Sequence, residues 1–228
     1  MKPMSNFEKK FGKYAIRNIS LVLILFYACG YLISWINPVM LNYLTLNPYA
    51  ILFKGQVWRL VTWLIVPPES FDFFTLIMLY FYYSIGTSLE RAWGTYRYNV
   101  YIFSGILFTV VGSFLCMGVV YLMYGSLPTE IASAYFYSGS YAFSTYYINL
   151  SIFLAFAATY PDMQVLLMFV IPVKVKWMGI LDAVLMLYYV IKGGVFTRFA
   201  IIASLLNFVL YFYRLHRSRI SPKQMHRR

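Results

Sequence analysis

Long apolar runs separated by short polar turns dominate the chain. Each run approaches the ~20 residues that a helix needs to cross roughly 30 Å of hydrocarbon. Five runs are clear: Ile19–Ile36, Phe73–Ser88, Tyr98–Tyr124, Phe143–Tyr160 and Val195–Phe212. The stretch 163–192 is less regular. We interpret Met178–Ile191 as a further span and Val165–Val173, broken by Pro172, as a segment at the membrane edge. The pattern predicts an all-α integral membrane protein with six transmembrane helices.

The regions outside the runs complete the predicted organisation. In residues 3–17, Ser5 and Glu8 have the spacing of a capping box, and Phe7, Phe11 and Tyr14 recur on one side of a helix. We therefore predict an interfacial basic segment over 1–18, a membrane domain over 19–213 and a basic cytoplasmic tail over 214–228.

The connection 37–70 is too apolar for an ordinary aqueous loop. It contains Asn37-Pro38, Asn47-Pro48 and Pro67-Pro68, which favour turns, around apolar stretches such as Tyr49–Phe53. Exposed backbone is costly at the bilayer margin, so this long, half-submerged first loop must satisfy its polar groups by local turns and contacts with protein.

Composition agrees with this interpretation. The chain is 61% hydrophobic and 11% charged, with a mean hydropathy of +0.67. A soluble domain is typically about 45–50% apolar and about 25% charged. The net charge of +12 raises the question of nucleic acid, but the basic residues lie at the two ends and in short turns, and no basic domain is present. We expect no nucleic-acid partner.

The basic residues also predict an orientation. With six spans, both termini, the 89–97 turn and the 161–177 loop share one side, and of the 19 basic residues only Lys54, Arg59, Lys192 and Arg198 fall on the other. Basic loops prefer the cytoplasm and attract anionic headgroups, so both termini are predicted to be cytoplasmic. Because organellar signals are not visible, a bacterial plasma membrane is favoured.

Few residues could carry chemistry. The two histidines, His216 and His226, lie in the basic tail, and the two cysteines, Cys29 and Cys116, lie inside apolar runs. A serine–histidine pair within the membrane, a metal site and a cofactor are therefore not expected. Nothing in the sequence indicates an oligomeric state.

Asp182 is the one acidic residue within an apolar run. An aspartate at the centre of a transmembrane helix costs about 2.5–3.5 kcal/mol on insertion scales, which makes it a candidate functional residue. The alternative is that Asp182 lies near the end of a short span and reaches water or a tyrosine hydroxyl. Small residues at four-residue spacing, such as Ser151, Ala155 and Thr159, indicate helix packing instead of catalysis.

Several motifs together resemble the rhomboid superfamily, which includes rhomboid proteases and derlin-type pseudoproteases. Gln56–Thr62, with Trp58-Arg59, resembles the first-loop signature of that family. The stretch 86–97, with Gly86, Leu89-Glu90-Arg91, Gly94 and Arg97, resembles its turn between spans two and three. Tyr160-Pro161 and Ile171-Pro172-Val173 resemble the end of its fourth span and the following loop. The match covers roughly residues 50–178, in order and with similar spacing.

The same resemblance shows that the catalytic elements are missing. The nucleophile position falls on Tyr146, the segment of the base reads Ala203–Asn207, and the positions that assist the oxyanion fall near Phe74 and Met78. Ser144 lies close to the nucleophile position but has no base to accept its proton. The resemblance therefore implies a pseudoprotease and not an enzyme.

Family members without the catalytic pair are thought to bind transmembrane helices of client proteins and to assist their trafficking or turnover. The resemblance gives binding roles to Trp58 and Arg59, which anchor the first loop, and to Glu90, Arg91 and Arg97, which hold the 89–97 turn, beside Asp182. Gly86, Gly94 and Pro161 are the structural positions.

Two alternatives are a rhomboid protease with a displaced site at Ser144 and a small-solute transporter that uses Asp182 and the tyrosine-rich spans. The chain has no inverted repeat, which disfavours the transporter.

Overall fold

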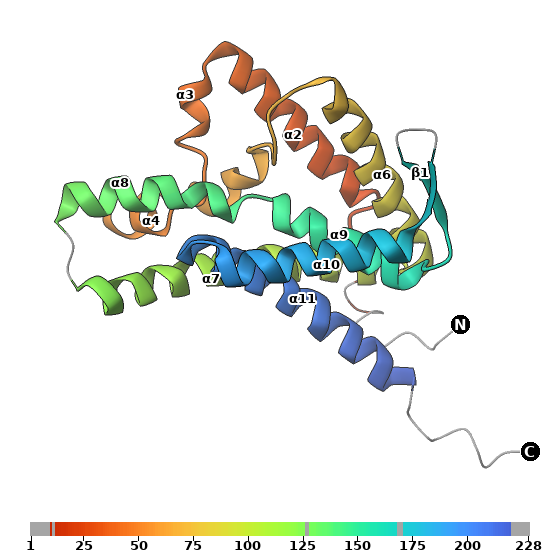
Figure 1. The fold of residues 1–228 in the computed structure, drawn as a ribbon. Coiled ribbons are helices and arrows are strands. Elements are labelled where there is room, and N and C mark those ends of the chain that lie inside the picture. The colour runs from red at the N-terminus through yellow and green to blue at the C-terminus, as the bar shows by residue number, and fades with distance from the viewer. Residues whose placement is uncertain (1–9, 11, 126–127, 168–170, 220–228) are drawn as a thin grey trace, which may run out of the picture.

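The computed structural model describes residue 10 and residues 12–125, 128–167 and 171–219. These residues form helices, three short 3₁₀ turns and one hairpin (Figure 1). In chain order the elements are η1 (Gly12–Tyr14), α2 (Ile19–Ile36), α3 (Pro38–Leu41), α4 (Pro48–Phe53), α5 (Arg59–Thr62), η2 (Trp63–Ile65), α6 (Phe73–Trp93), α7 (Thr95–Tyr124), α8 (Thr129–Ser140), η3 (Tyr141–Phe143), α9 (Tyr146–Thr159), β1 (Gln164–Leu167), β2 (Ile171–Lys174), α10 (Val175–Lys192) and α11 (Val195–Arg219).

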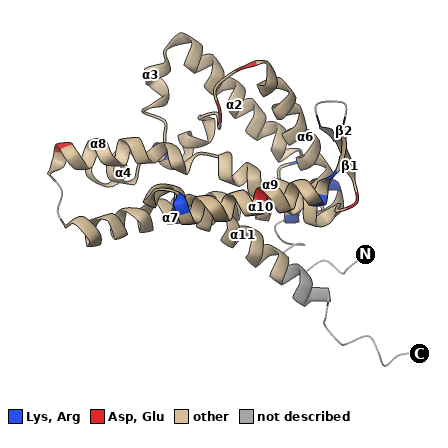
Figure 2. Cartoon of the chain, viewed as in Figure 1, with Lys and Arg blue, Asp and Glu red and all other residues tan. Residues whose placement is uncertain are grey.

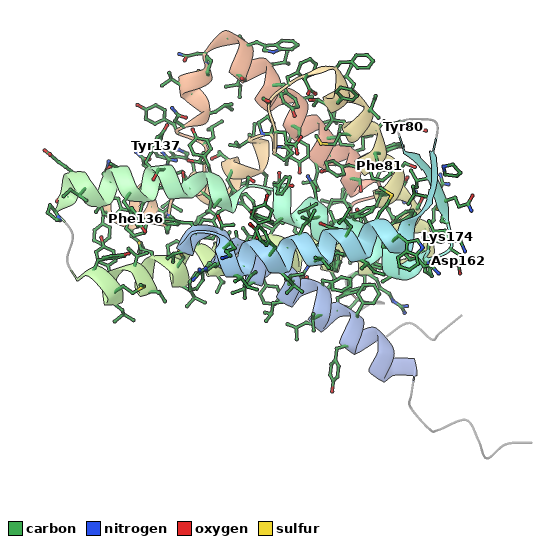
Figure 3. The ribbon with its side chains drawn as sticks, viewed as in Figure 1. Tyr80, Phe81, Phe136, Tyr137, Asp162 and Lys174 are labelled. Carbon is green, nitrogen blue, oxygen red and sulfur yellow. The ribbon has the colours of Figure 1, made fainter. Side chains whose placement is uncertain are left out.

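The central helix of the bundle is α9, which is buried along most of its length. Helices α6, α10 and α11 all pack on α9, and α11 also runs along α7. Phe81 of α6 lies against Phe153 of α9 with ring centroids 6.0 Å apart, whereas Tyr80 points away from the bundle (Figure 3). Apolar helices thus surround one buried helix, with large hydrophobic side chains left on the outside for lipid.

Polar bonds hold the helices together inside this apolar bundle. Asn207 of α11 accepts from the Ser104 hydroxyl at 2.6 Å and donates to the Tyr101 carbonyl at 3.1 Å. Tyr101 in turn donates to the Ser151 carbonyl of α9 at 2.8 Å. Each bond is worth about 1–2 kcal/mol or less in a membrane protein, but together they fix the relative rotation of α7, α9 and α11.

The connection between α2 and α6 folds locally, as the sequence indicates. Asn37 and Asn47 cap α3 and α4, where each side-chain oxygen accepts an N–H of the following turn and a proline occupies the first helical position. Asparagine at the N-cap and proline at N1 are the preferred start of a helix. The loop therefore satisfies its own backbone and packs against α8 through α4.

Helix α8 was not predicted. Ala132, Phe136, Gly139 and Ser140 form its buried side, which is a helical period. Phe136 stacks on Tyr49 of α4 and Tyr121 of α7, while Tyr137 points to the other side of the helix (Figure 3). Because serine, threonine and glycine interrupt the apolar positions, the segment lacks the long apolar run on which the prediction relied.

On either side of residues 168–170, Gln164–Leu167 and Ile171–Lys174 are the two paired strands of an antiparallel hairpin, where the sequence predicted only an apolar run at the membrane edge. β1 pairs with β2, with Leu166 opposite Pro172. Beside the hairpin, Asp162 lies 3.5 Å from the Lys174 ammonium and 3.9 Å from that of Lys176 (Figure 3). These pairs are exposed and contribute little to stability.

Among the described residues, four helical stretches are long and apolar enough to cross a membrane: Gly12–Ile36, Thr95–Tyr124, Thr129–Thr159 and Val195–Tyr213. The expected spans on α6 and α10 are helices, and α10 begins at Val175 and not at Met178. They are less apolar, because α6 contains several Tyr, Ser and Thr residues and α10 carries Lys176, Asp182 and Lys192. The count of six spans therefore remains a prediction.

One end of the bundle collects the chain segments that the charge pattern assigned to a single side. The start of α2, the turn between α6 and α7 and the hairpin lie together at the right of Figure 1. Lys and Arg gather at that end (Figure 2). Most of the predicted interfacial segment 3–17 and the end of the tail lie outside the described residues. The part of 214–228 that is described continues α11 as far as Arg219.

Candidate functional site

Two regions of the described structure are candidates for a functional site. The first surrounds Asp182 in the middle of the bundle and is called the Asp182 cluster. The second lies between the loop 37–65 and α8 and is called the α8 cavity.

The Asp182 cluster joins three helices. Asp182 of α10 is 9% exposed, and its carboxylate interacts electrostatically with Tyr82 of α6 and Tyr146 of α9, although Glu69 of the first loop acts on both tyrosines more strongly. Asp182 lies seven residues into α10, which places it about 10 Å along the helix from Val175. Because the helix begins at Val175 and not at Met178, Asp182 lies further from the start of the helix than the sequence indicated.

The Asp182 carboxylate has no hydrogen-bond partner within the described part of the chain. Its Oδ2 atom is buried and unpaired, and no tyrosine hydroxyl is bonded to it. An unpaired polar atom in an apolar interior costs about 1–3 kcal/mol, and more when it is charged. Helix α6, which carries Tyr82, and helix α10, which carries Asp182, both pack on α9.

Arg59 is the buried cation of the first loop. Its side chain is 4% exposed, and its guanidinium donates through Nε to Gln56 at 2.7 Å and through Nη1 to the carbonyl oxygens of Asn42 and Thr45, both at 2.9 Å. Burial lowers the pKa of Arg59 from 12.5, although an arginine remains a cation in proteins. Trp58 next to it is 49% exposed and donates from Nε1 to the Tyr43 carbonyl at 3.2 Å. Both side chains thus brace the loop 42–62.

Glu90 holds the turn between α6 and α7, but through neutral groups. Its Oε1 atom accepts from the Asn18 backbone N–H at 3.2 Å and from the Thr95 hydroxyl at 2.9 Å. Arg91 is exposed, and Arg97 is partly buried. The turn itself needs Gly94, whose φ of 88° and ψ of 150° lie in a region that is essentially restricted to glycine.

Gly86 and Pro161 differ in their surroundings. A Cβ atom on Gly86 would lie 1.9 Å from the Ser20 hydroxyl oxygen and 2.7 Å from that of Tyr98, so α2, α6 and α7 meet at this glycine. Pro161 is exposed and follows α9, and its carbonyl accepts from the Lys176 N–H at 3.2 Å.

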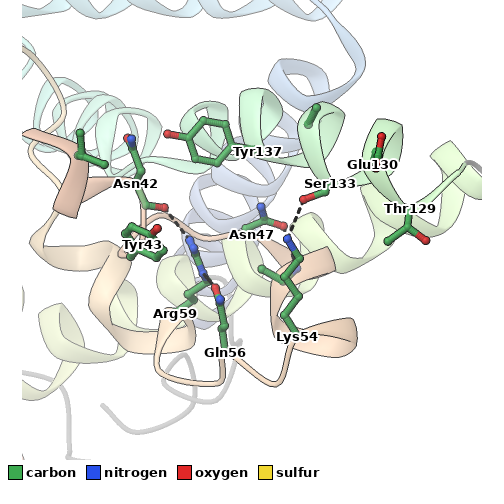
Figure 4. A pocket seen from close by; sticks show the side chains of 13 residues that line it. Asn42, Tyr43, Asn47, Lys54, Gln56, Arg59, Thr129, Glu130, Ser133 and Tyr137 are labelled. Carbon is green, nitrogen blue, oxygen red and sulfur yellow. Dashed lines mark hydrogen bonds between the residues drawn. The ribbon is translucent and has the colours of Figure 1, made fainter.

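The α8 cavity was not predicted. It has a volume of about 620 Å³. Its lining comes from the first loop and from α8, and comprises Val39, Asn42, Tyr43, Asn47, Ala50, Lys54, Gln56, Arg59, Thr129, Glu130, Ser133, Ala134 and Tyr137 (Figure 4). Of these residues the sequence singled out only Arg59, because the other wall belongs to the unpredicted helix.

Within the described residues, no three His, Cys, Asp or Glu side chains lie together as metal ligands would.

These features define a helical bundle built for a membrane, with buried polar groups among its apolar helices. The chain matches the family described as eukaryotic integral membrane protein (DUF1751) over residues 17–225, and it belongs to that family. No curated protein and no solved structure matches it. The bacterial plasma membrane expected from the sequence finds no support, because the family is eukaryotic.

Proposed function

We propose that this chain is a non-catalytic, rhomboid-like membrane protein that binds transmembrane segments of other proteins. The observation that carries the proposal is the Asp182 carboxylate, buried on a membrane helix without a hydrogen-bond partner in the described structure. A buried acceptor of this kind is stabilised when an entering helix supplies a donor, such as a serine, threonine, asparagine or lysine side chain.

The position of the cluster supports a helix as the ligand. Asp182 lies on α10, which packs on α9 and α11 and keeps several large apolar side chains exposed. A helix that approaches α10 from the lipid finds large apolar side chains on the same helix as Asp182, with Leu181 60% and Tyr189 49% exposed. Clients are therefore expected to carry a polar residue within an otherwise apolar span.

The absence of an activated nucleophile supports a non-catalytic role. The Ser144 hydroxyl accepts the Tyr146 backbone N–H at 3.3 Å, and no base is bonded to it in the described structure. The resemblance aligns the nucleophile with the segment of Tyr146 and the base with the segment 203–207. These segments are adjacent in the structure, and the hydrogen bond that joins them runs from the Ser204 hydroxyl to the Tyr147 carbonyl at 2.5 Å. His216 lies twelve residues beyond Ser204 on α11, about 18 Å along the helix.

Site-specific photo-crosslinking tests the proposal directly. A photoactivatable amino acid at Met78 of α6 or at Tyr189 of α10 is expected to capture membrane proteins with polar residues in their spans. The matched control is Leu107 of α7, which is 60% exposed to lipid on another helix. Capture of lipid alone from Met78 and Tyr189, or equal protein capture from Leu107, would contradict the proposal.

A fluorophosphonate probe separates this proposal from the protease alternative. We expect no specific serine labelling of the detergent-solubilised chain beside a labelled active rhomboid protease. Labelling of the wild type that is lost in Ser144→Ala would favour the protease alternative over this proposal.

A further inference from the structure

The α8 cavity presents an excess of hydrogen-bond donors. The side-chain oxygen of Asn47 is taken by the Ala50 N–H at 3.0 Å, and that of Gln56 by Arg59 Nε at 2.7 Å. Both amides therefore keep their NH₂ groups as unused donors. The two N–H groups of Arg59 Nη2 also find no acceptor among the described residues, since the printed bonds of this side chain run through Nε and Nη1.

Positive charge accompanies these donors. Lys54 donates from Nζ to the Ser133 hydroxyl at 2.8 Å, which leaves two of its three N–H groups free of that bond. Glu130 also lines the cavity, but no ion pair joins it to Lys54 or Arg59 in the described structure. Two cations and one carboxylate leave the cavity with an excess positive charge that the protein does not neutralise.

The arrangement of these groups suits a compact anion with several oxygens. In Figure 4, Lys54, Gln56, Arg59 and Asn47 come from the first loop, and Ser133 and Tyr137 face them from α8. Arginine and lysine together with neutral N–H donors are the usual partners of phosphate oxygens.

The surroundings of the cavity indicate that the anion carries an apolar body. Val39 lines the cavity and is 58% exposed; Val57, 62% exposed, and Trp58, 49% exposed, stand in the chain between the lining residues Gln56 and Arg59. Exposed valine and tryptophan side chains beside a polar pocket are typical of the membrane interface, where a tryptophan lies at headgroup level.

We propose that the α8 cavity binds the phosphate group of a phospholipid, with Lys54 and Arg59 as its cationic contacts and the acyl chains lying outside over the exposed valine and tryptophan side chains. The volume of about 620 Å³ lies within the roughly 300–1,000 Å³ of small-molecule sites and accommodates a headgroup without the chains. The bound lipid would join the first loop to α8.

The test is lipid binding by the purified full chain in detergent, measured by native mass spectrometry during titration with dioleoyl phosphatidic acid. Lys54→Gln removes one charge while keeping a donor for Ser133, and we expect it to weaken binding about tenfold, which corresponds to one charge-assisted hydrogen bond. Lys192→Gln is the matched control, because Lys192 is exposed and lies outside the cavity. We expect it to bind like the wild type.

Two further probes identify what is recognised. Dioleoylglycerol has the same chains without phosphate and should not bind above background. Inorganic phosphate should compete only weakly, because it lacks the chains.

Three results would overturn the assignment: equal affinity of wild type and Lys54→Gln, equal loss in Lys192→Gln, or phosphate binding as tightly as the lipid. Arg59→Lys, tested in parallel, should also weaken binding, and its thermal unfolding shows whether the loop has remained folded.

Discussion

Two carboxylates of this protein are equally exposed but differ in their surroundings. Glu90 and Asp182 are both 9% exposed. Glu90 accepts two hydrogen bonds, from the Asn18 backbone and the Thr95 hydroxyl, at the end of the bundle where the turns gather. Asp182 accepts none from the described residues, in the middle of α10. Each carboxylate has one buried oxygen without a partner among the described residues, Oε2 of Glu90 and Oδ2 of Asp182. The two acids therefore differ in whether the other oxygen is hydrogen-bonded, and not in burial.

The end of the bundle that contains Glu90 should be intolerant of change, and Gly86 provides the largest expected effect. Gly86→Ala places a methyl group 1.9 Å from the Ser20 oxygen, and overpacking of this kind costs about 1–3 kcal/mol. A lower temperature of thermal unfolding in detergent is expected. Gly118→Ala on α7 is the control, since no atom lies within 4 Å of its added Cβ, and it should unfold like the wild type. Equal unfolding temperatures of the two variants would contradict the close approach of α2 and α7 to α6 at Gly86.

Removing the Glu90 carboxylate tests its structural role. Glu90→Leu leaves the Asn18 N–H and the Thr95 hydroxyl without their acceptor, which should cost about 1–3 kcal/mol of unfolding free energy. Glu90→Gln retains an acceptor oxygen and should lose much less. Denaturant unfolding of the two variants measures the difference. Equal losses would show that the charge of Glu90, and not its hydrogen bonds, holds the turn.

Asp182 should respond in the opposite direction. Asp182→Leu replaces an unpaired buried carboxylate with an apolar side chain of similar size. The unfolding free energy should therefore rise by about 1 kcal/mol or remain unchanged. The thermal unfolding temperature of Asp182→Leu, compared with that of the wild type, measures this change in stability. A loss as large as that of Glu90→Leu would mean that Asp182 has a structural partner and that the contrast between the two acids does not hold.

An exposed carboxylate supplies the smallest expected effect. Asp72 caps α6, and the hydrogen bonds from the Thr75 side chain and backbone lower its pKa below the ordinary 3.8. A lowered pKa in the folded state stabilises the protein above pH 3.8, and this contribution disappears as the pH falls through the lower folded value. The unfolding temperature of the wild type should therefore decrease below pH 3.8 slightly more than that of Asp72→Asn. Parallel pH profiles would contradict the cap.

How far the sequence could predict the structure depended on the kind of signal. The long apolar run of α2 has the bounds that were predicted, Ile19–Ile36, because an uninterrupted run leaves few alternatives in a membrane. Helix α8 was missed because its apolar positions are separated by serine and glycine. Its buried residues nevertheless recur as 132, 136 and 139, so a search for helical period in place of apolar length would have found it.

The candidate sites divide in the same way. Asp182 could be identified from the sequence alone, because a charged residue is rare within a long apolar run. Its association with Tyr82 and Tyr146 could not be predicted, because tyrosine is common throughout the chain and only packing brings these two to the aspartate. The α8 cavity could not be predicted, since Lys54 and Ser133 are 79 residues apart and meet only when the loop folds against α8.

The most direct test of a binding role for Asp182 is crosslinking from Tyr189 in the wild type, in Asp182→Leu and in Glu90→Gln. We expect protein capture to fall several-fold in Asp182→Leu, although this variant remains at least as stable as the wild type, and to persist in Glu90→Gln. Undiminished capture in a folded Asp182→Leu would contradict the claim that the unpaired carboxylate recognises membrane segments.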